Sequence, residues 1–172
     1  MDSYAIVPAS RQHLAAVPAI EQAAAGLIPE EDLPLALRFL VTSPDVLVEA
    51  QQDGRIWMAL GADQVPVGFA YAVVMAGEAH LDETNVHPRH GRRGLGKRLV
   101  QAVIDWSKAS GFAALTLITF HHLPWNAPFY AKLGFEIVPP ELVIPEHREL
   151  IEAEADAGIN AADRIVMRLK LS

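Results

Sequence analysis

A glycine-rich segment crowded with basic side chains is the first part of this sequence that could do chemistry. It reads HPRHGRRGLGKRLV over residues 87–100 and holds five of the 14 Lys and Arg residues of the chain. Glycines let a backbone turn approach a bulky anion, and the first N–H groups of a helix bind phosphate groups. We therefore expect a diphosphate site here. Its expected residues are Arg92, Arg93, Gly94, Leu95, Gly96 and Lys97.

Two well-known phosphate motifs fit this segment only in part. From Gly91 to Arg98 it follows the P-loop pattern until the last place, where Arg98 replaces the Ser or Thr that ligates magnesium. The dinucleotide fingerprint begins with Gly94 and Gly96, but Leu99 occupies the place of the third glycine. A nucleotide triphosphatase and a nicotinamide-binding domain are therefore disfavoured, whereas a phosphate-binding protein stays open.

A second segment, TFHHLPWNAPFYAKLGF over residues 119–135, leaves an apolar run through a short loop and enters a helix that ends at Gly-Phe. Together with the glycine-rich turn, it resembles the GNAT superfamily of N-acetyltransferases. The residues that carry the resemblance are Gly94, Gly96, Phe129, Tyr130, Gly134 and Phe135. The likeness spans about residues 55–138, and the two motifs at this separation are far more specific than either alone.

The resemblance implies an α+β fold with a mixed, mostly antiparallel central sheet of about six to seven strands and helices on both faces. The fourth and fifth strands would splay apart to admit acetyl-coenzyme A, the cosubstrate of the family. The resemblance further implies that a backbone N–H near Val86 polarises the thioester carbonyl and that Phe129 contacts the cosubstrate.

This chain departs from the family pattern at two cofactor positions. Family members have Arg or Gln where Gly91 stands, so we expect Arg92 or Arg93 to supply the missing contact. An Asn that contacts the pantetheine arm in relatives is replaced by Leu123, and Asn126 is the nearest amide. Asn126 is therefore included among the expected cofactor-binding residues.

Acetyl transfer to an amine needs a proton acceptor for the amine and a proton donor for the departing thiolate. The resemblance assigns the donor role to Tyr130. Some relatives carry a Glu as the base on the fifth strand, but Ile118 holds that place here. Glu83 on the preceding strand is our candidate base, with ordered water as the alternative. Because side chains alternate along a strand, its neighbour Asp82 is expected to face the other way.

The expected function is transfer of an acetyl group from acetyl-coenzyme A to the primary amine of a small molecule, by direct attack in a ternary complex. A non-catalytic module that binds acyl-coenzyme A is the alternative. In the family the acceptor pocket is built from segments that correspond to residues 21–40 and 139–160. The acidic residues there that could attract a cationic amine are Glu30, Glu31, Asp32, Glu152, Glu154 and Asp156.

Composition argues against several other classes of protein. The chain has 172 residues, 51% of them hydrophobic, which is typical of a single domain spanning residues 1–172. Its net charge of −7 disfavours binding to nucleic acid or to an anionic membrane. It has no cysteine, no leader pattern and no apolar run of about 18 residues, so we expect a cytoplasmic protein. Five histidines could suggest a metal site, namely His80, His87, His90, His121 and His122. The best pair, His87 and His90, lies in a turn without a clear carboxylate partner, so no metal is expected. A homodimer stays open.

The helices and strands that must position these residues follow from periodicity, caps and turns. Helices are expected over residues 10–25, 29–40, 44–51, 95–110, 127–133 and 146–155, the first of them kinked or split at Pro18. Strands are expected over residues 3–7, 55–60, 65–75, 79–86, 114–119, 135–138 and 164–171. Two apolar faces are expected, one formed by Leu95, Leu99, Val103 and Trp106, the other by Ile165, Met167, Leu169 and Leu171.

Overall fold

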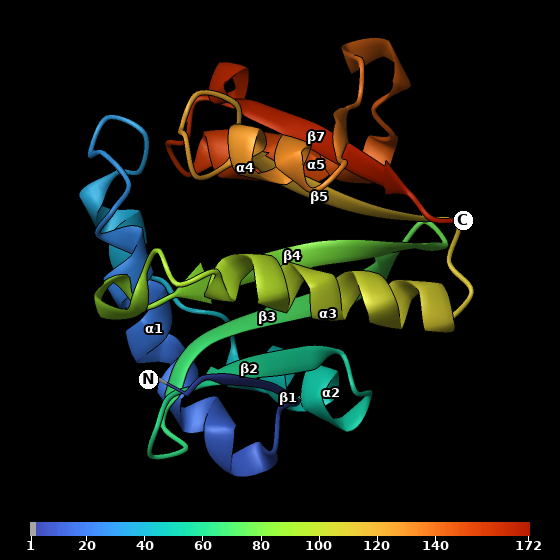
Figure 1. Cartoon of the computed structure of the whole chain (residues 1–172). Helices are drawn as coiled ribbons and strands as arrows, with labels where there is room; N and C mark the ends of the chain where they lie inside the picture. The colour runs from blue at the N-terminus through green and yellow to red at the C-terminus, as the bar shows by residue number, and fades with distance from the viewer. Residues whose placement is uncertain (1–2) are drawn as a thin grey trace.

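A seven-stranded sheet forms the centre of the computed structural model, which describes residues 3–172 (Figure 1). The strands lie in the order β1-β2-β3-β4-β5-β7-β6, and every neighbouring pair is antiparallel except β4 and β5. Their bounds are β1 (Ala5–Pro8), β2 (Ile56–Leu60), β3 (Pro66–Met75), β4 (Glu78–Val86), β5 (Ala114–Phe120), β6 (Glu136–Ile137) and β7 (Arg164–Lys170). The predicted α+β class with a mixed, mostly antiparallel sheet is confirmed.

Helices cover both faces of this sheet. Their bounds are α1 (Val17–Ala25), α2 (Pro44–Gln52), α3 (Leu95–Ala109), α4 (Ala127–Lys132) and α5 (Pro145–Asp156). Five short 3-10 helices connect them, η1 (Arg11–Ala16), η2 (Leu35–Phe39), η3 (Pro88–His90), η4 (Pro140–Leu142) and η5 (Ala161–Asp163). Within residues 3–172, none of the helices combines the length and the apolar character needed to cross a membrane.

Two apolar clusters hold the layers together, one on each face of the sheet. The first contains the buried face of α3, with Leu95, Leu99 and Val103 at most 1% exposed and Trp106 packed beside them. The predicted face of β7 packs into the same cluster, which confirms its alternation. The second cluster joins α1 and α2 to the opposite side of β2 and β3. The sheet therefore has an α3 side and an α1/α2 side, and these names are kept below.

Strands β4 and β5 pair at one end and then separate. Their parallel ladder consists of two residue pairs, Ala79 with Leu115 and His80 with Thr116, although β4 continues to Val86. Figure 1 shows the two strands close together near the C-terminal end of α3 and far apart at the other end of the sheet. The predicted splay between the fourth and fifth strands is confirmed.

A β-bulge in β4 lies where the separation begins. The register of β4 against β3 shifts between Tyr71 and Ala72, which pair with Glu83 and Leu81 respectively, so Asp82 is the extra residue. A bulge bends its strand and increases the local twist. The bulge therefore helps to turn the end of β4 away from β5.

Most of the predicted elements are confirmed to within a residue or two, but the helix expected over residues 29–40 is wrong. Only η2 forms there, after a series of turns. Pro34 explains the difference, because proline lacks an N–H group and its ring clashes with the preceding helical turn. The predicted split at Pro18 is confirmed, since η1 ends before it and α1 begins at Val17.

Candidate active site

The glycine-rich turn leads directly into α3, as the sequence predicted. Gly94 is the residue before the helix and has a φ of +74°, a left-handed conformation that residues with a side chain rarely adopt. A Cβ atom added to Gly94 would meet nothing within 4 Å, so open space lies in front of the turn. The first N–H groups of a helix have no acceptor within the helix. The N–H groups of Leu95, Gly96 and Lys97 are therefore available to an anion.

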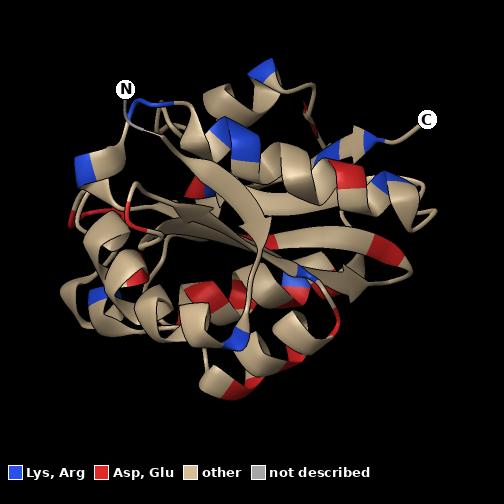
Figure 2. Cartoon of the chain, turned by 60° about the horizontal axis from the view of Figure 1, so that its bottom comes forward, with Lys and Arg blue, Asp and Glu red and all other residues tan. Residues whose placement is uncertain are grey.

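Basic side chains surround this turn. Arg92, Arg93 and Lys97 are all exposed, and Arg93 places its guanidinium carbon 5.6 Å from the ring centre of Tyr4. Figure 2 shows blue residues in the loop before α3 and on its first turns, whereas much of the red lies across the sheet. The structure therefore keeps the expected basic side chains around the helix terminus, and their contact with a diphosphate stays a prediction.

The second motif lies beside the first, although more than thirty residues separate them in the sequence. A Cβ atom added to Gly96 would lie 3.6 Å from Cζ of Phe129, so the Phe129 ring covers the first turn of α3. The ring of Tyr130 lies 5.1 Å from that of Phe129 and 5.7 Å from that of Phe135. The glycine turn and the aromatic helix α4 therefore contact each other.

The end of β4 offers backbone groups to the gap between β4 and β5. The N–H of His87 donates to the carbonyl of Val67 on β3 over 2.8 Å. Because N–H groups point to alternate sides along a strand, the N–H of Val86 points away from β3 and toward the gap. The backbone N–H of Thr84, two residues earlier, has the same orientation. The side-chain Oγ1 of Thr84 is buried and has no hydrogen-bond partner in residues 3–172. The N–H of Val86 is therefore not used in the pairing with β3 and is available to a ligand.

Tyr130 approaches this gap from the α3 side. Burial raises the pKa of Tyr130 to about 12, with the negative charge of Glu83 acting in the same direction. The hydroxyl of Thr84 is near enough to lower that pKa, but its geometry falls short of a normal hydrogen bond. The phenol of Tyr130 is therefore protonated at neutral pH and can act as a hydrogen-bond donor.

Glu83 approaches from the opposite side of the sheet. Burial raises the pKa of Glu83 to about 7, and the negative charges of Asp82 and Glu21 contribute. The Nδ2 group of Asn85 donates to Glu83 Oε2 over 2.9 Å and acts in the other direction. A carboxyl group with this pKa exchanges its proton near neutral pH, which is the property that a general base needs.

The expectation that Asp82 and Glu83 face opposite ways is wrong, because the bulge in β4 interrupts the alternation. Glu83 pairs with Tyr71 and so shares its face, the α1/α2 side. The hydroxyl of Tyr71 also donates to Asp82 Oδ2, so both carboxylates lie around this tyrosine. Asp82 keeps access to solvent, yet enough protein surrounds its carboxyl group to raise its pKa by desolvation.

A third carboxylate belongs to the same group and was missed from the sequence. Glu21 on α1 accepts hydrogen bonds from the N–H of Thr42 over 2.9 and 3.2 Å. Burial raises its pKa, and the charge of Asp82 adds to this effect. Only the packing of α1 against β4 brings these residues together, so no local pattern could have shown it. Glu21, Asp82 and Glu83 are called the carboxylate group below.

Other expected site residues form hydrogen bonds or ion pairs within the protein. Asn126 accepts a hydrogen bond from Thr119 Oγ1 over 2.6 Å, which fixes its amide beside the end of β5. Two of the six acidic residues expected to attract an amine instead interact with side chains of the protein itself. Asp32 accepts from His122 over 2.9 Å, and Glu154 forms an ion pair with Arg164 over 2.6 Å.

Comparison with known proteins identifies the family from the sequence itself. The model of the acetyltransferase (GNAT) family matches residues 26–135. This range contains the glycine turn, the end of β4, β5 and the aromatic helix α4.

Solved structures show the same fold at low sequence identity. PaiA N-acetyltransferase from Thermoplasma acidophilum, in complex with coenzyme A, has a TM-score of 0.69 at 20% identity, over 98% of this chain and 99% of that chain. N-acetylglutamate synthase from Neisseria gonorrhoeae, complexed with coenzyme A and N-acetyl-glutamate, has a TM-score of 0.69 at 19% identity. The match covers 99% of this chain and 35% of the synthase chain. A ribosomal-protein alanine N-acetyltransferase from Escherichia coli has a TM-score of 0.69 at 22% identity, and the match covers 99% of this chain and 95% of that chain.

Proposed function

The chain belongs to the GNAT family of acetyltransferases, and we propose that it transfers an acetyl group from acetyl-coenzyme A to the primary amine of a small molecule. One observation supports this most strongly. Where β4 and β5 separate, the carboxyl group of Glu83, with a pKa of about 7, lies on the α1/α2 side of the sheet, and the protonated phenol of Tyr130 packs on the α3 side. The proposal needs one copy of the chain, acting as one domain over residues 1–172.

The residues of the glycine turn would hold the cosubstrate. Coenzyme A carries a diphosphate, which suits the N–H groups at the start of α3 and the basic side chains around them. Two structural neighbours are complexes with coenzyme A, which supports acetyl-coenzyme A as the cosubstrate. The residues proposed to bind it are Val86, Arg92, Arg93, Gly94, Leu95, Gly96, Lys97, Asn126 and Phe129. The thioester supplies the acetyl group.

Three groups would then act on the reacting atoms. An ammonium acceptor first releases one proton to solvent, because only the neutral amine attacks. As its nitrogen bonds to the carbonyl carbon, Glu83 accepts the second proton, which solvent later returns to Tyr130. The N–H of Val86 donates to the carbonyl oxygen, where negative charge develops. As the carbon–sulfur bond breaks, the hydroxyl of Tyr130 donates to the departing sulfur. No covalent protein intermediate is needed, and the acetyl group passes directly to the amine.

The carboxylate group suits a cationic acceptor. Glu21, Asp82 and Glu83 place three carboxyl groups on the α1/α2 side of the gap, and each negative charge raises the local concentration of an ammonium ion. A protein amino terminus is the competing acceptor, because one structural neighbour is an alanine N-acetyltransferase. A panel containing small amines and short peptides separates the two.

Release of free thiol from acetyl-coenzyme A tests the proposal. We expect turnover that depends on a small amine, intersecting initial-rate lines when both substrates are varied, and no acetylated protein in the intact mass. Glu83→Gln should abolish the dependence of kcat/KM on pH near 7, and the exposed Glu149→Gln serves as the matched control. Binding of acetyl-coenzyme A without turnover on any amine or peptide would instead support a non-catalytic module.

A further inference from the structure

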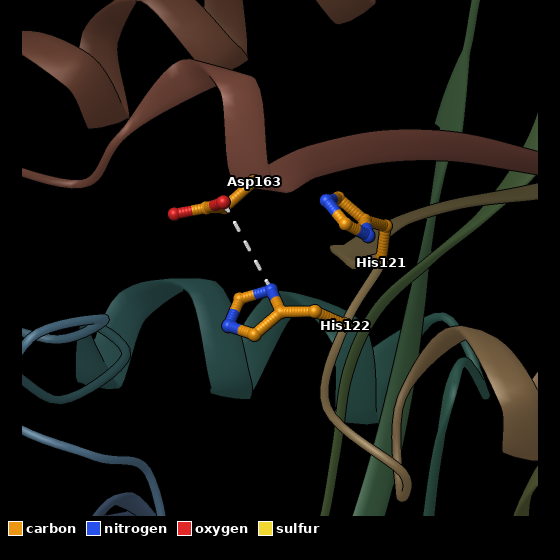
Figure 3. A group of neighbouring side chains, drawn as sticks. All are labelled: His121, His122 and Asp163. Carbon is orange, nitrogen blue, oxygen red and sulfur yellow. Dashed lines mark ion pairs between the residues drawn. The ribbon is translucent and has the colours of Figure 1, made fainter.

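A group of two histidines and one aspartate lies where β5 ends and β7 begins. His121 and His122 directly follow β5, and Asp163 directly precedes β7. The N–H of His121 donates to the carbonyl of Asp163 over 3.0 Å, so the antiparallel pairing of the strands continues to this point. One ligand atom from each side chain lies within 4.8 Å of the other two, and Figure 3 shows the three side chains converging from the two strand ends.

The orientation of His122 is fixed by a buried carboxylate. Its Nε2–H group donates to Oδ1 of Asp32 over 2.9 Å, and Asp32 is only 7% exposed. The other ring nitrogen, Nδ1, then faces Oδ1 of Asp163 at 4.0 Å, along the dashed line in Figure 3. At this distance the two atoms are too far apart for a direct hydrogen bond, so a metal ion can bind between them without breaking one.

Metal-bound histidines commonly have this arrangement. The ring nitrogen that does not bind the metal donates to a carboxylate, which selects the tautomer and orients the ring. Asp32 does this for His122, although it comes from a segment about ninety residues earlier in the chain. His121 is exposed and can rotate toward the same point.

We propose that His121, His122 and Asp163 bind one divalent transition-metal ion of the zinc type, with Asp32 orienting His122 from outside the ligand set. Two imidazoles and one carboxylate suit zinc, whereas magnesium and calcium prefer oxygen ligands. The ligand atoms of a tetrahedral zinc ion lie roughly 3.4 Å apart. The present spacing therefore needs only a modest rotation of exposed side chains. Three protein ligands leave a fourth position for water or another ligand.

The ion would join three segments that border the acceptor side of the gap. It links the start of the β5–α4 connection to the start of β7 and, through Asp32, to the turns before η2. Arg164, next to Asp163, is the cation whose charge acts on both Glu83 and Tyr130. This site uses none of the residues proposed for acetyl transfer, so the two proposals can fail independently.

Titration of the metal-stripped full chain, purified without a histidine tag, tests this proposal. Zn²⁺ is followed by calorimetry and Co²⁺ by its visible absorption, and we expect one ion per chain with a tetrahedral cobalt spectrum. A saturating ion should also raise the melting temperature, because it binds only the folded state. His121→Ala and Asp163→Asn should each remove this binding, since both side chains reach solvent and neither change disturbs the core.

Two further variants make the result specific. Asp32→Asn should weaken Zn²⁺ affinity by about 10- to 100-fold, the usual effect of losing an outer-shell carboxylate. The double variant His87→Ala/His90→Ala removes another pair of neighbouring histidines, whose ring centres are 6.2 Å apart, and should bind as the parent does. The proposal is overturned if the parent binds no stoichiometric ion, or if Asp163→Asn binds as tightly as the parent.

Discussion

Replacement of Glu83 by Gln should make the protein more stable at slightly alkaline pH while removing its base. Glu83 is partly buried among other carboxylates, so its ionised form is disfavoured in the folded state. Glutamine has nearly the same shape and can still accept the hydrogen bond from Asn85 Nδ2. The variant therefore removes the cost of ionisation without leaving a cavity.

The magnitude follows from the pKa of Glu83, which is about 7 in the folded protein and 4.5 ordinarily. Below pH 4.5 both states hold the proton, and the side chain contributes no pH dependence. Between pH 4.5 and about 7 the unfolded chain releases the proton while the folded protein keeps it, so stability falls as pH rises. Each pKa unit corresponds to about 1.4 kcal/mol, so the total loss approaches about 3 kcal/mol.

Urea denaturation at several pH values measures this effect. We expect the free energy of unfolding of Glu83→Gln to equal that of the parent near about pH 4.5 and to exceed it by up to about 3 kcal/mol near about pH 8. The exposed Glu149→Gln should follow the parent throughout. If Glu83→Gln is no more stable than the parent at the higher pH, the carboxyl group is not destabilised by its surroundings, and our choice of base loses its physical support.

Three further predictions concern the acid, the turn and the core. Tyr130→Phe should lower kcat by about 100-fold or more, the usual contribution of a proton donor, with little change in acetyl-coenzyme A affinity; an unchanged kcat would remove its assigned role. Gly94→Ala and Gly77→Ala each place a side chain at a left-handed φ, of +74° and +78° respectively, and urea denaturation should show a stability loss of about 1–2 kcal/mol for each. Only Gly94→Ala should also raise the Kd for acetyl-coenzyme A, by about tenfold or more. Burial lowers the pKa of His80 to about 4, so part of the stability present above pH 6.5 is lost as pH falls toward 4. His80→Asn should reduce that loss by up to about 3 kcal/mol. A pH profile identical to that of the parent would show that His80 is not buried as a neutral ring.

The sequence predicted the order and type of nearly all elements because most have strong local signals. The apolar residues of α3 repeat with helical spacing, and the alternating apolar residues of β7 pack into the same cluster in the structure. The helix expected over residues 29–40 does not form, because Pro34 lacks an N–H group and its ring clashes with the preceding helical turn.

The candidate site was predictable only where it depends on short motifs. Gly94 and Gly96 are neighbours in the chain, and their geometry follows from the turn itself. The bulge at Asp82 could not be seen, because it depends on pairing with β3, and it places both carboxylates on one face. Glu21 joins them only after α1 has packed on the sheet, a contact between residues about sixty positions apart.

Titration of acetyl-coenzyme A into the purified chain by calorimetry is the most direct test of the central claim, that the turn before α3 and the gap beside β4 together hold this thioester. We predict one binding site per chain, with no displacement by an equal concentration of ATP. An absence of binding, or preferential binding of ATP, would contradict the account and would favour a simple phosphate-binding turn.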